Sequence, residues 1–285
     1  MKTHIVNVSS GLASAEALER TIARVGIDHT IGVFADVKGN STSEHAGEDA
    51  DNYRFLDDTE RYFGIPIIRI VEGRDIWQVM FDERAITLPV GKTRVAKCSI
   101  KLKREPIDQW IEAHYRPDEC VQVTGLGWAE PHRIADFIKA KAPYETWHPL
   151  NESPYVDNCL IEQKWAARGI RAPRLYEQGF SHANCGGFCV KAGQAHFARL
   201  YFANRPRYIY HAEKEKRFRA EINPKATILR DRRGGKVTLM TLYEFAERLD
   251  RGEDYDRDDW GGCGCFAQEP QLRMDDLLLE TDIKR

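Results

Sequence analysis

The sequence predicts an α/β fold built on a parallel sheet. Three short apolar segments, at residues 4–8, 30–36 and 65–70, have the composition of buried strands. The first two are each followed by a segment with apolar residues at helical spacing, at 15–25 and 48–63. Strands that alternate with helices are typical of parallel sheets. A chain of 285 residues can form one large domain with an appendage, or two domains.

The first predicted strand leads directly into a short Ser- and Gly-rich loop, residues 9–14, and a helix follows at once. Free backbone N–H groups at a helix N-terminus, together with the helix dipole, favour an anion over such a loop. The alternative is that Ser14 is a plain N-cap. The residues that we expect to contact a phosphate here are Ser9, Ser10, Gly11 and Ser14.

The second predicted strand ends in an acidic residue, Asp36. The carboxyl ends of parallel strands face the ligand crevice, so Asp36 is expected near the loop at 9–14. There it could act as a general base or stabilise a cationic intermediate. The alternative is that Asp36 caps a helix or a turn.

A fourth strand begins at Cys120 and leads through a Gly turn to Glu130 and Arg133, at the start of a helix. Both residues are expected on the crevice side of the sheet. Arg133 could clamp a phosphate with two hydrogen bonds, or it could pair with Glu130.

Two Gly-rich segments, far apart in the sequence, carry paired cysteines. Cys185 and Cys189 lie within residues 179–194, and Cys263 and Cys265 lie within residues 261–265. Glycines allow the backbone to bend tightly around a metal ion, and four thiolates suit one metal centre. Such a centre would attach the C-terminal tail to the body. The alternative is that the four cysteines are reduced and pack as small apolar side chains.

The composition excludes some classes of protein. The formal net charge is -2, so the chain lacks the overall positive charge that would by itself indicate a nucleic-acid binder. Basic residues concentrate at 92–104 and 205–236, where they could hold a phosphate or a polynucleotide backbone, or form solvated helix faces. Because no apolar segment is long enough for a membrane span or a signal peptide, we expect a cytoplasmic protein with reduced thiols and no membrane contact.

The loop at 9–14 resembles that of the phosphoadenosine-phosphosulfate reductase family of PP-loop proteins, a group with the adenine nucleotide alpha hydrolase-like (HUP) fold. The family loop reads Ser-Gly-Gly-x-Asp-Ser, so Ser9, Gly11 and Ser14 match it, whereas Ser10 and Ala13 depart from it. The missing acidic residue at Ala13 argues against magnesium-dependent cleavage of ATP. The loop can still hold a phosphate.

Other motifs resemble the same family. Its acidic residue after the second strand and its acidic and arginine pair after the fourth are matched by Asp36, Glu130 and Arg133. Members with an iron–sulfur cluster carry Cys-Cys-x-x-Arg-Lys-x-x-Pro, which Cys98 and Lys103 match in part. The resemblance therefore implies Cys98 as a substitute metal ligand and Lys103 as a further phosphate contact. It spans about residues 4–200, is closest over 169–194, and is nearer to phage-type members than to sulfate-assimilation enzymes.

The resemblance implies a PP-loop α/β domain over residues 1–204 and a 4Fe-4S cluster, although zinc fits four thiolates equally well. For residues 205–285 we expect a helical and hairpin region, tied back by Cys263 and Cys265. The basic segments and scattered aromatic residues suit a polynucleotide with a flipped or single-stranded base; these aromatics include Trp77, Trp110, Trp128 and Tyr210. The alternative is that they belong to the core, which is the more common place for scattered aromatics.

Three functions follow as expectations. The first is a nucleotide- or nucleic-acid-acting enzyme that modifies or excises a base in DNA, in a phage or phage-defence context, with Asp36 and Glu130 as catalytic groups. The second is an ATP-dependent sulfur-transfer or phosphoadenosine-phosphosulfate reductase enzyme. The third is a non-catalytic nucleotide-binding module.

Overall fold

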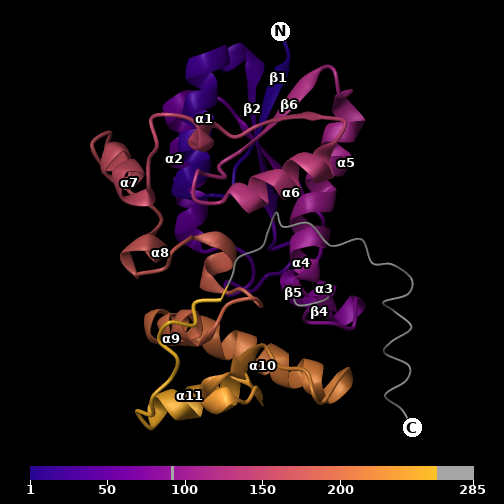
Figure 1. Cartoon of the computed structure of the whole chain (residues 1–285), viewed down its shortest axis with the longest axis vertical. Helices are drawn as coiled ribbons and strands as arrows, with labels where there is room; N and C mark the ends of the chain where they lie inside the picture. Colours follow the sequence, from indigo (N-terminus) through magenta and orange to yellow (C-terminus); the bar gives the residue numbers. More distant parts are fainter. Residues whose placement is uncertain (91–92, 262–285) are drawn as a thin grey trace.

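A computed structural model describes residues 1–90 and 93–261 of the chain (Figure 1). Its centre is a five-stranded sheet in the order β3-β2-β1-β6-β7, and every neighbouring pair of strands is parallel. The strands are β1 (Thr3–Asn7), β2 (Thr30–Asp36), β3 (Ile67–Val71), β6 (Cys120–Thr124) and β7 (Glu145–Trp147). The predicted α/β fold with a parallel sheet is confirmed, and its arrangement is Rossmann-like.

Helices cover both faces of the sheet (Figure 1). Helices α1 (Leu12–Val25) and α2 (Ala50–Phe63) pack on one face, where Leu18 and Leu56 join strand residues such as Phe34 in one apolar cluster. Helix α5 (Glu105–His114) packs on the other face, where Ile107 and Ile111 contribute to a separate cluster. Strands buried on both faces read as continuous apolar runs, which is why β1 and β2 could be found in the sequence.

The direction in which strands are added to the sheet changes at β1. Strand β2 pairs with one edge of β1 and β6 pairs with the other, so the chain crosses from β3 to the far side of β1 before it forms β6. In sheets of this type, ligands bind outside the carboxyl ends of the strands at such a switch point. The loops after β1 and β6 therefore occupy the position in which a site is expected.

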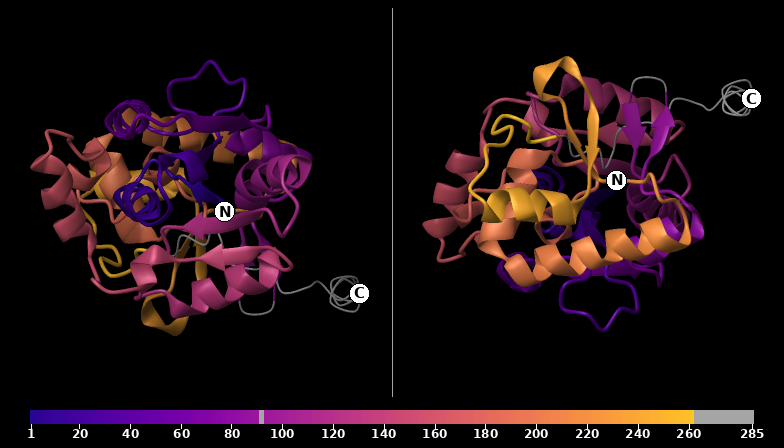
Figure 2. Two further views of the ribbon diagram at one scale, coloured as in Figure 1. Left: turned by 90° about the horizontal axis from the view of Figure 1, so that it is seen from above. Right: turned by 90° about the horizontal axis from the view of Figure 1, so that it is seen from below.

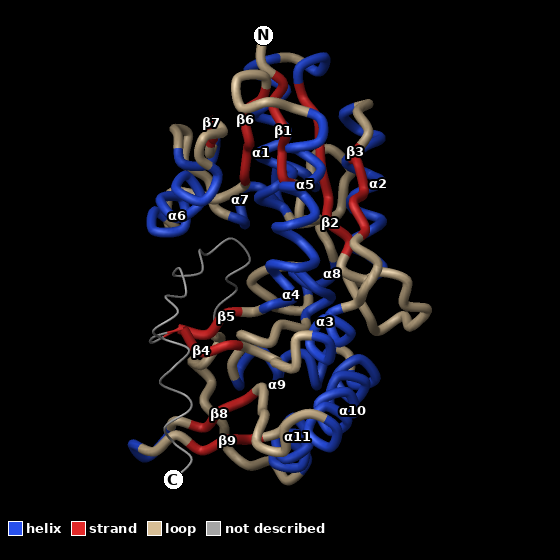
Figure 3. The backbone as a smooth tube through the Cα atoms, turned by 90° about the vertical axis from the view of Figure 1, so that its right-hand side faces the viewer, coloured by secondary structure: helices blue, strands red, loops and turns tan. Residues whose placement is uncertain are grey.

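A second group of elements lies beyond the carboxyl ends of the strands (Figures 2 and 3). It contains helices α9 (Gln194–Ala203), α10 (Arg205–Glu221) and α11 (Leu242–Asp250), and an antiparallel hairpin of β8 (Leu229–Asp231) and β9 (Thr238–Met240). Their buried side chains form one cluster with those of α3 (Ile76–Asp82). This cluster includes Phe197 and Tyr208, and so it joins residues on both sides of the boundary expected after residue 204.

The remaining elements are short. They are β4 (Leu88–Val90), β5 (Thr93–Val95), α4 (Lys97–Ser99), α6 (Pro131–Lys141), α7 (Asn158–Ala166), α8 (Arg174–Glu177), the π-helical η2 (Ile100–Arg104), and the 3-10 turns η1 (Ile27–His29), η3 (Pro149–Asn151), η4 (Asn184–Gly187) and η5 (Arg233–Gly235).

Across the described residues, no helix combines the length and the apolar character that crossing a membrane requires.

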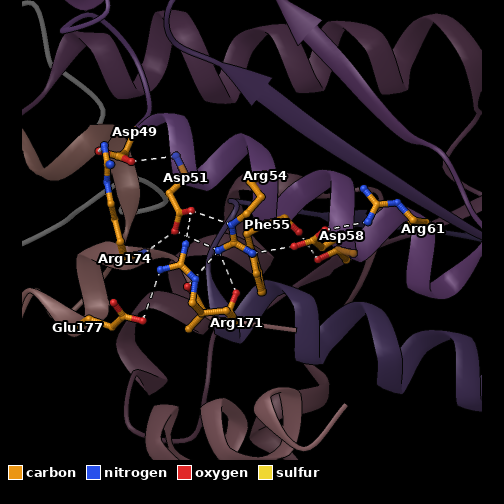
Figure 4. Close-up of polar contacts among 11 residues, drawn as sticks. Asp49, Asp51, Arg54, Phe55, Asp58, Arg61, Arg171, Arg174 and Glu177 are labelled. Carbon is orange, nitrogen blue, oxygen red and sulfur yellow. Dashed lines mark hydrogen bonds and ion pairs between the residues drawn. The ribbon is translucent and has the colours of Figure 1, made fainter. Parts of the chain in front are cut away.

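A network of ion pairs fixes the segment before α8 to helix α2 (Figure 4). The carboxylate of Asp51 accepts hydrogen bonds from Arg54 Nε at 2.7 Å and from Arg171 Nη2 at 2.8 Å. Arg174 pairs with Asp49, the N-cap of α2, at 2.8 Å. These contacts hold in place the short helix that carries Tyr176, which reaches the loop after β1.

Candidate functional site

A cavity of about 440 Å³ opens where the sheet predicts a ligand site. Its walls come from the carboxyl ends of β1, β2 and β6, the first turn of α1, the start of α6, and segments near residues 103, 176 and 182. The predicted site residues that line it are Ser9, Gly11, Ser14, Lys103, Glu130 and Arg133. These six residues come from three separate regions of the sequence, at 9–14, 103 and 130–133, and they meet at one cavity.

The side chain of Ser14 organises the loop after β1. Its Oγ accepts a hydrogen bond from the Ser9 N–H at 3.0 Å and donates one to the Gly11 carbonyl at 2.9 Å. Ser10 takes a positive φ of 57° and is buried, so it is not among the residues that line the cavity. Ser9, Gly11 and Ser14 thus lie at the cavity wall, beside the positive end of the α1 dipole.

The loop is held in shape by close packing from two directions. The hydroxyl of Tyr176 accepts a hydrogen bond from the Leu12 N–H at 3.3 Å. On the other side, a Cβ built on Gly125 would lie 2.8 Å from the Ala13 carbonyl oxygen, so any side chain there would displace the loop. Burial raises the pKa of Tyr176 to about 12.

Glu130 and Arg133 form an ion pair on the cavity wall. Both belong to the start of α6, where Glu130 is the N-cap residue. The pairing that the sequence offered as an alternative is therefore present. The Nε atom of Arg133 is buried and has no hydrogen-bond partner within the described part of the chain.

Lys103 brings a buried positive charge to the same cavity. It is only 9% exposed, and its Nζ lies 3.4 Å from Oε1 of Glu48, which is itself 2% exposed. Burial raises the pKa of Glu48, while the charge of Lys103 opposes that rise. Glu48 also accepts hydrogen bonds from Asn52 and from the Gly186 N–H, and so it ties this lysine to the cysteine-bearing loop.

His182 lies on the cavity wall, and no spacing in the sequence pointed to it. Burial lowers its pKa to about 4, and the charges of His196, Lys103 and Arg133 act in the same direction. The ring is therefore neutral at pH 7 in a positively charged part of the cavity. Its buried Nδ1 has no hydrogen-bond partner in residues 1–90 and 93–261.

Asp36 lies at the end of β2 but is not among the cavity-lining residues. Its Oδ1 accepts hydrogen bonds from the Lys38 N–H at 2.9 Å and from the Tyr53 hydroxyl at 2.7 Å. Burial and then the hydrogen bond to Asp36 raise the pKa of Tyr53. These contacts are those of a turn cap, which was the alternative interpretation, and its catalytic role stays a prediction.

A second, much smaller cavity of about 20 Å³ is lined by three cysteines, Cys98, Cys185 and Cys189. Lys103 lines this cavity as well as the larger one, so the two share a wall. Lys191 also lines this cavity. Within the residues that the structure describes, no cluster of three or more metal-ligand side chains is found.

The cysteine loop depends on consecutive residues with positive φ. Cys185, Gly186 and Gly187 have φ values of 53°, 60° and 81°. A Cβ on Gly186 would lie 2.0 Å from Nη1 of Arg207, a buried side chain that donates to the Gly47 carbonyl. The paired glycines are therefore needed for the tight bend that the sequence led us to expect.

Cys263 and Cys265 lie outside the described residues. The last described part of the chain returns to the cysteine loop, because Gly261 forms a bridge with Ala192. The Asp259 carbonyl also accepts a hydrogen bond from the Ala195 N–H at 2.9 Å, at the start of α9. The chain that precedes Cys263 is thus fixed near Cys189.

Three thiols line one cavity, and Cys263 and Cys265 follow Gly261 in the sequence. Thiolates are ligands of zinc and of iron–sulfur clusters, and the expected metal centre stays a prediction. The other described cysteines lie elsewhere. Cys120 is buried on β6, where burial raises its pKa to about 11, and Cys159 is exposed on α7.

Comparison with known proteins adds no relative. No protein-family model matches the sequence, and no match was found among the curated proteins.

Proposed function

We propose that this protein is an enzyme that acts on a nucleotide or a nucleic acid, and that its reaction modifies or excises a base in DNA. The observation that carries the proposal is the cavity at the switch point of the sheet, because it combines a phosphate-binding loop, two cationic side chains and groups able to move a proton. Within the proposal, the fold is the PP-loop variant of the adenine nucleotide alpha hydrolase-like group.

Each cavity residue has a role in this proposal. Backbone N–H groups of the loop at 9–14 bind a phosphate at the α1 terminus, and Lys103 and Arg133 supply charge-assisted contacts. Glu130 is the one carboxylate among the described lining residues, so it is the group best placed to accept a proton from the ligand or from water. Apolar walls from Val8 and Phe34 accommodate a base.

The cysteine cavity supports a second candidate, an ATP-dependent sulfur-transfer or phosphoadenosine-phosphosulfate reductase reaction. Cys98, Cys185 and Cys189 line a cavity that shares Lys103 with the larger one. We propose that these thiols, with Cys263 and Cys265, hold zinc or a 4Fe-4S cluster. Such a centre would supply rigidity or electron transfer. Ala13 stands where the related loop has a carboxylate, which favours the first candidate.

Isothermal titration calorimetry tests the proposal with three ligands: ATP, phosphoadenosine phosphosulfate and a short single-stranded DNA. We expect binding of at least one of them, weakened about tenfold or more by Arg133→Ala, because one charge-assisted contact is lost. Arg251→Ala is the matched control, since Arg251 is exposed at the end of α11. Absence of binding to all three ligands would refute the proposal. Efficient release of pyrophosphate from ATP would favour the second candidate.

A further inference from the structure

Two exposed aromatic side chains lie on segments that also contribute residues to the larger cavity. Trp128 is on the turn between β6 and α6, and Tyr155 is on the segment between η3 and α7. They are 52% and 59% exposed, and their ring centroids are 6.2 Å apart with an interplanar angle of 67°. Large aromatic side chains that contact each other at a surface are a feature of binding sites.

Both aromatic residues are close in the chain to residues that line the cavity. Leu126 and Glu130, which flank Trp128, are part of the cavity wall, and so is Asn158, three residues after Tyr155. Trp128 and Tyr155 themselves are not among the lining residues. The pair therefore lies on two segments that border the cavity, outside its lining, and these segments are called the rim below.

Hydrogen bonds fix the segment before Tyr155 to α1, the helix that follows the loop at 9–14. The guanidinium of Arg20, on α1, donates to the carbonyl oxygens of Pro149 at 2.9 Å, Glu152 at 3.3 Å and Pro154 at 2.7 Å. These contacts hold the segment that leads into Tyr155. On the other side, the Glu130 N–H donates to the Gly127 carbonyl at 2.9 Å and closes the turn that carries Trp128.

The carboxylates near Tyr155 are already engaged within the protein. Asp157 caps α7, since its Oδ1 accepts a hydrogen bond from the Leu160 N–H at 2.8 Å. Glu152 pairs with Arg24 at 3.4 Å and accepts a hydrogen bond from the indole N–H of Trp147 at 2.7 Å. These contacts reduce the repulsion that a phosphodiester backbone would meet at the rim.

The cavity by itself has both a phosphate loop and apolar walls, so it can hold one complete nucleotide. A base that reaches the exposed pair must then belong to the next nucleotide. We propose that Trp128 and Tyr155 form a stacking platform for this neighbouring base, so that the ligand is a single-stranded oligonucleotide rather than a free nucleotide. The inference rests on the proposed function, because it assumes that the cavity holds a nucleotide. Aromatic side chains stack on any base, since every base presents a π-face.

Calorimetric titration of the full chain with deoxyadenosine monophosphate and with single-stranded tetradeoxyadenylate tests the platform, at one fixed salt concentration. We expect the tetranucleotide to bind more tightly than the mononucleotide. Trp128→Ala and Tyr155→Ala should each weaken tetranucleotide binding about tenfold and leave mononucleotide binding unchanged. Trp128→Phe should retain most of the affinity. Phe202→Ala, which removes a 69% exposed aromatic on α9, is the matched control.

Two results would overturn the platform alone: equal tetranucleotide affinities for Trp128→Ala, Tyr155→Ala and the unmodified protein, or a tetranucleotide that binds no better than the mononucleotide. In both cases the proposed function would still hold if the protein bound the mononucleotide and if Arg133→Ala weakened that binding. If the unmodified protein bound neither ligand, the platform would be refuted, and the titrations with ATP, phosphoadenosine phosphosulfate and short single-stranded DNA would decide the proposed function separately. Thermal melting of each variant checks that it is folded.

Discussion

Glu130 and Arg133 show how one ion pair can control the affinity of the cavity. The carboxylate neutralises the guanidinium that would otherwise meet a phosphate, and a bound anion must compete with it. We predict that Glu130→Gln lowers the dissociation constant of a phosphate-bearing ligand by a few fold, because a neutral amide competes less well for Arg133. The same variant should slow any reaction in which Glu130 moves a proton.

Calorimetry on Glu130→Gln, with Glu247→Gln on the surface of α11 as the control, measures this effect. Weaker ligand binding by Glu130→Gln would contradict the prediction, because it would mean that the carboxylate itself contacts the ligand.

Buried histidines set the response of the protein to acid. Burial lowers the pKa values of His182 and His148 to about 4, and that of His211 to well below the ordinary value. Between about pH 4 and pH 6.5, these histidines bind protons in the unfolded chain but not in the folded chain. The free energy of unfolding should therefore decrease as the pH falls from about 6.5 towards 4.

Urea unfolding at intervals between pH 7 and pH 4 measures this dependence. A His148→Gln variant should lose less stability over the same interval, because one buried imidazole no longer titrates. His148 accepts or donates one hydrogen bond with Thr124 and has a buried Nε2 without a partner among the described residues, which explains its resistance to protonation. A pH-independent unfolding midpoint would contradict the account.

At the scale of elements, apolar patterns predicted the strands of the sheet better than they predicted the second group of elements, which contains α9, α10, α11 and the hairpin of β8 and β9. Strand β2 was predicted over its full length because it is a continuous apolar run that ends at Asp36. Strand β7 has only three residues, and its sequence, Glu145 to Trp147, has no strand pattern. In α10 the buried face includes Arg207 and Glu215, so the helix has no apolar pattern at helical spacing in the sequence.

A substitution at Gly186 tests why two glycines follow Cys185 in the cysteine loop. Gly186→Ala places a Cβ at 2.0 Å from Arg207 Nη1 in a residue with φ of 60°. We predict a loss of roughly 2–4 kcal/mol in the free energy of unfolding, from backbone strain and displacement of a buried guanidinium. Gly64→Ala is the matched control, because Gly64 has φ of 68° and open space around its Cβ position.

Gly64→Ala should cost only about 1 kcal/mol, the strain of the left-handed conformation alone. Equal losses for the two variants, measured by urea unfolding, would show that the contact with Arg207 does not matter.

At the scale of the whole molecule, Cys98 lines the same cavity as Cys185 and Cys189, which are far from it in the sequence. We predict that anaerobically purified protein contains zinc or iron, and that Cys185→Ser lowers the metal content and the melting temperature, because metal-binding energy is part of the folding energy. Cys159→Ser is the control, since Cys159 is exposed on α7. Replacement of Cys263 and Cys265 together should have the same effect as Cys185→Ser.

Elemental analysis by mass spectrometry gives the zinc and iron content per chain for each variant. Folded, unmodified protein that is free of metal would show that these cysteines are ordinary apolar residues. An equal loss of metal in Cys159→Ser would show that the metal is bound elsewhere.

The site was predicted from the sequence in part, and the limits have physical causes. Loop positions after β1 and β6 follow from strand ends, so Ser9, Gly11 and Arg133 could be placed at one crevice. His182 and Tyr176 come from segments without a regular period, and only tertiary packing brings them to the cavity. Asp36 was placed at the right strand end, but its carboxylate is held by Tyr53.

The central claim is that the cavity between β1 and β6 binds the phosphate-bearing ligand, and hydrogen exchange with and without a bound nucleotide tests it most directly. The account predicts slower exchange, on ligand binding, in peptides that cover residues 8–14, 124–133 and 176–184, because these segments line the cavity. Protection confined to another surface, such as the hollow formed by residues 40–42 and helix α10, would contradict it.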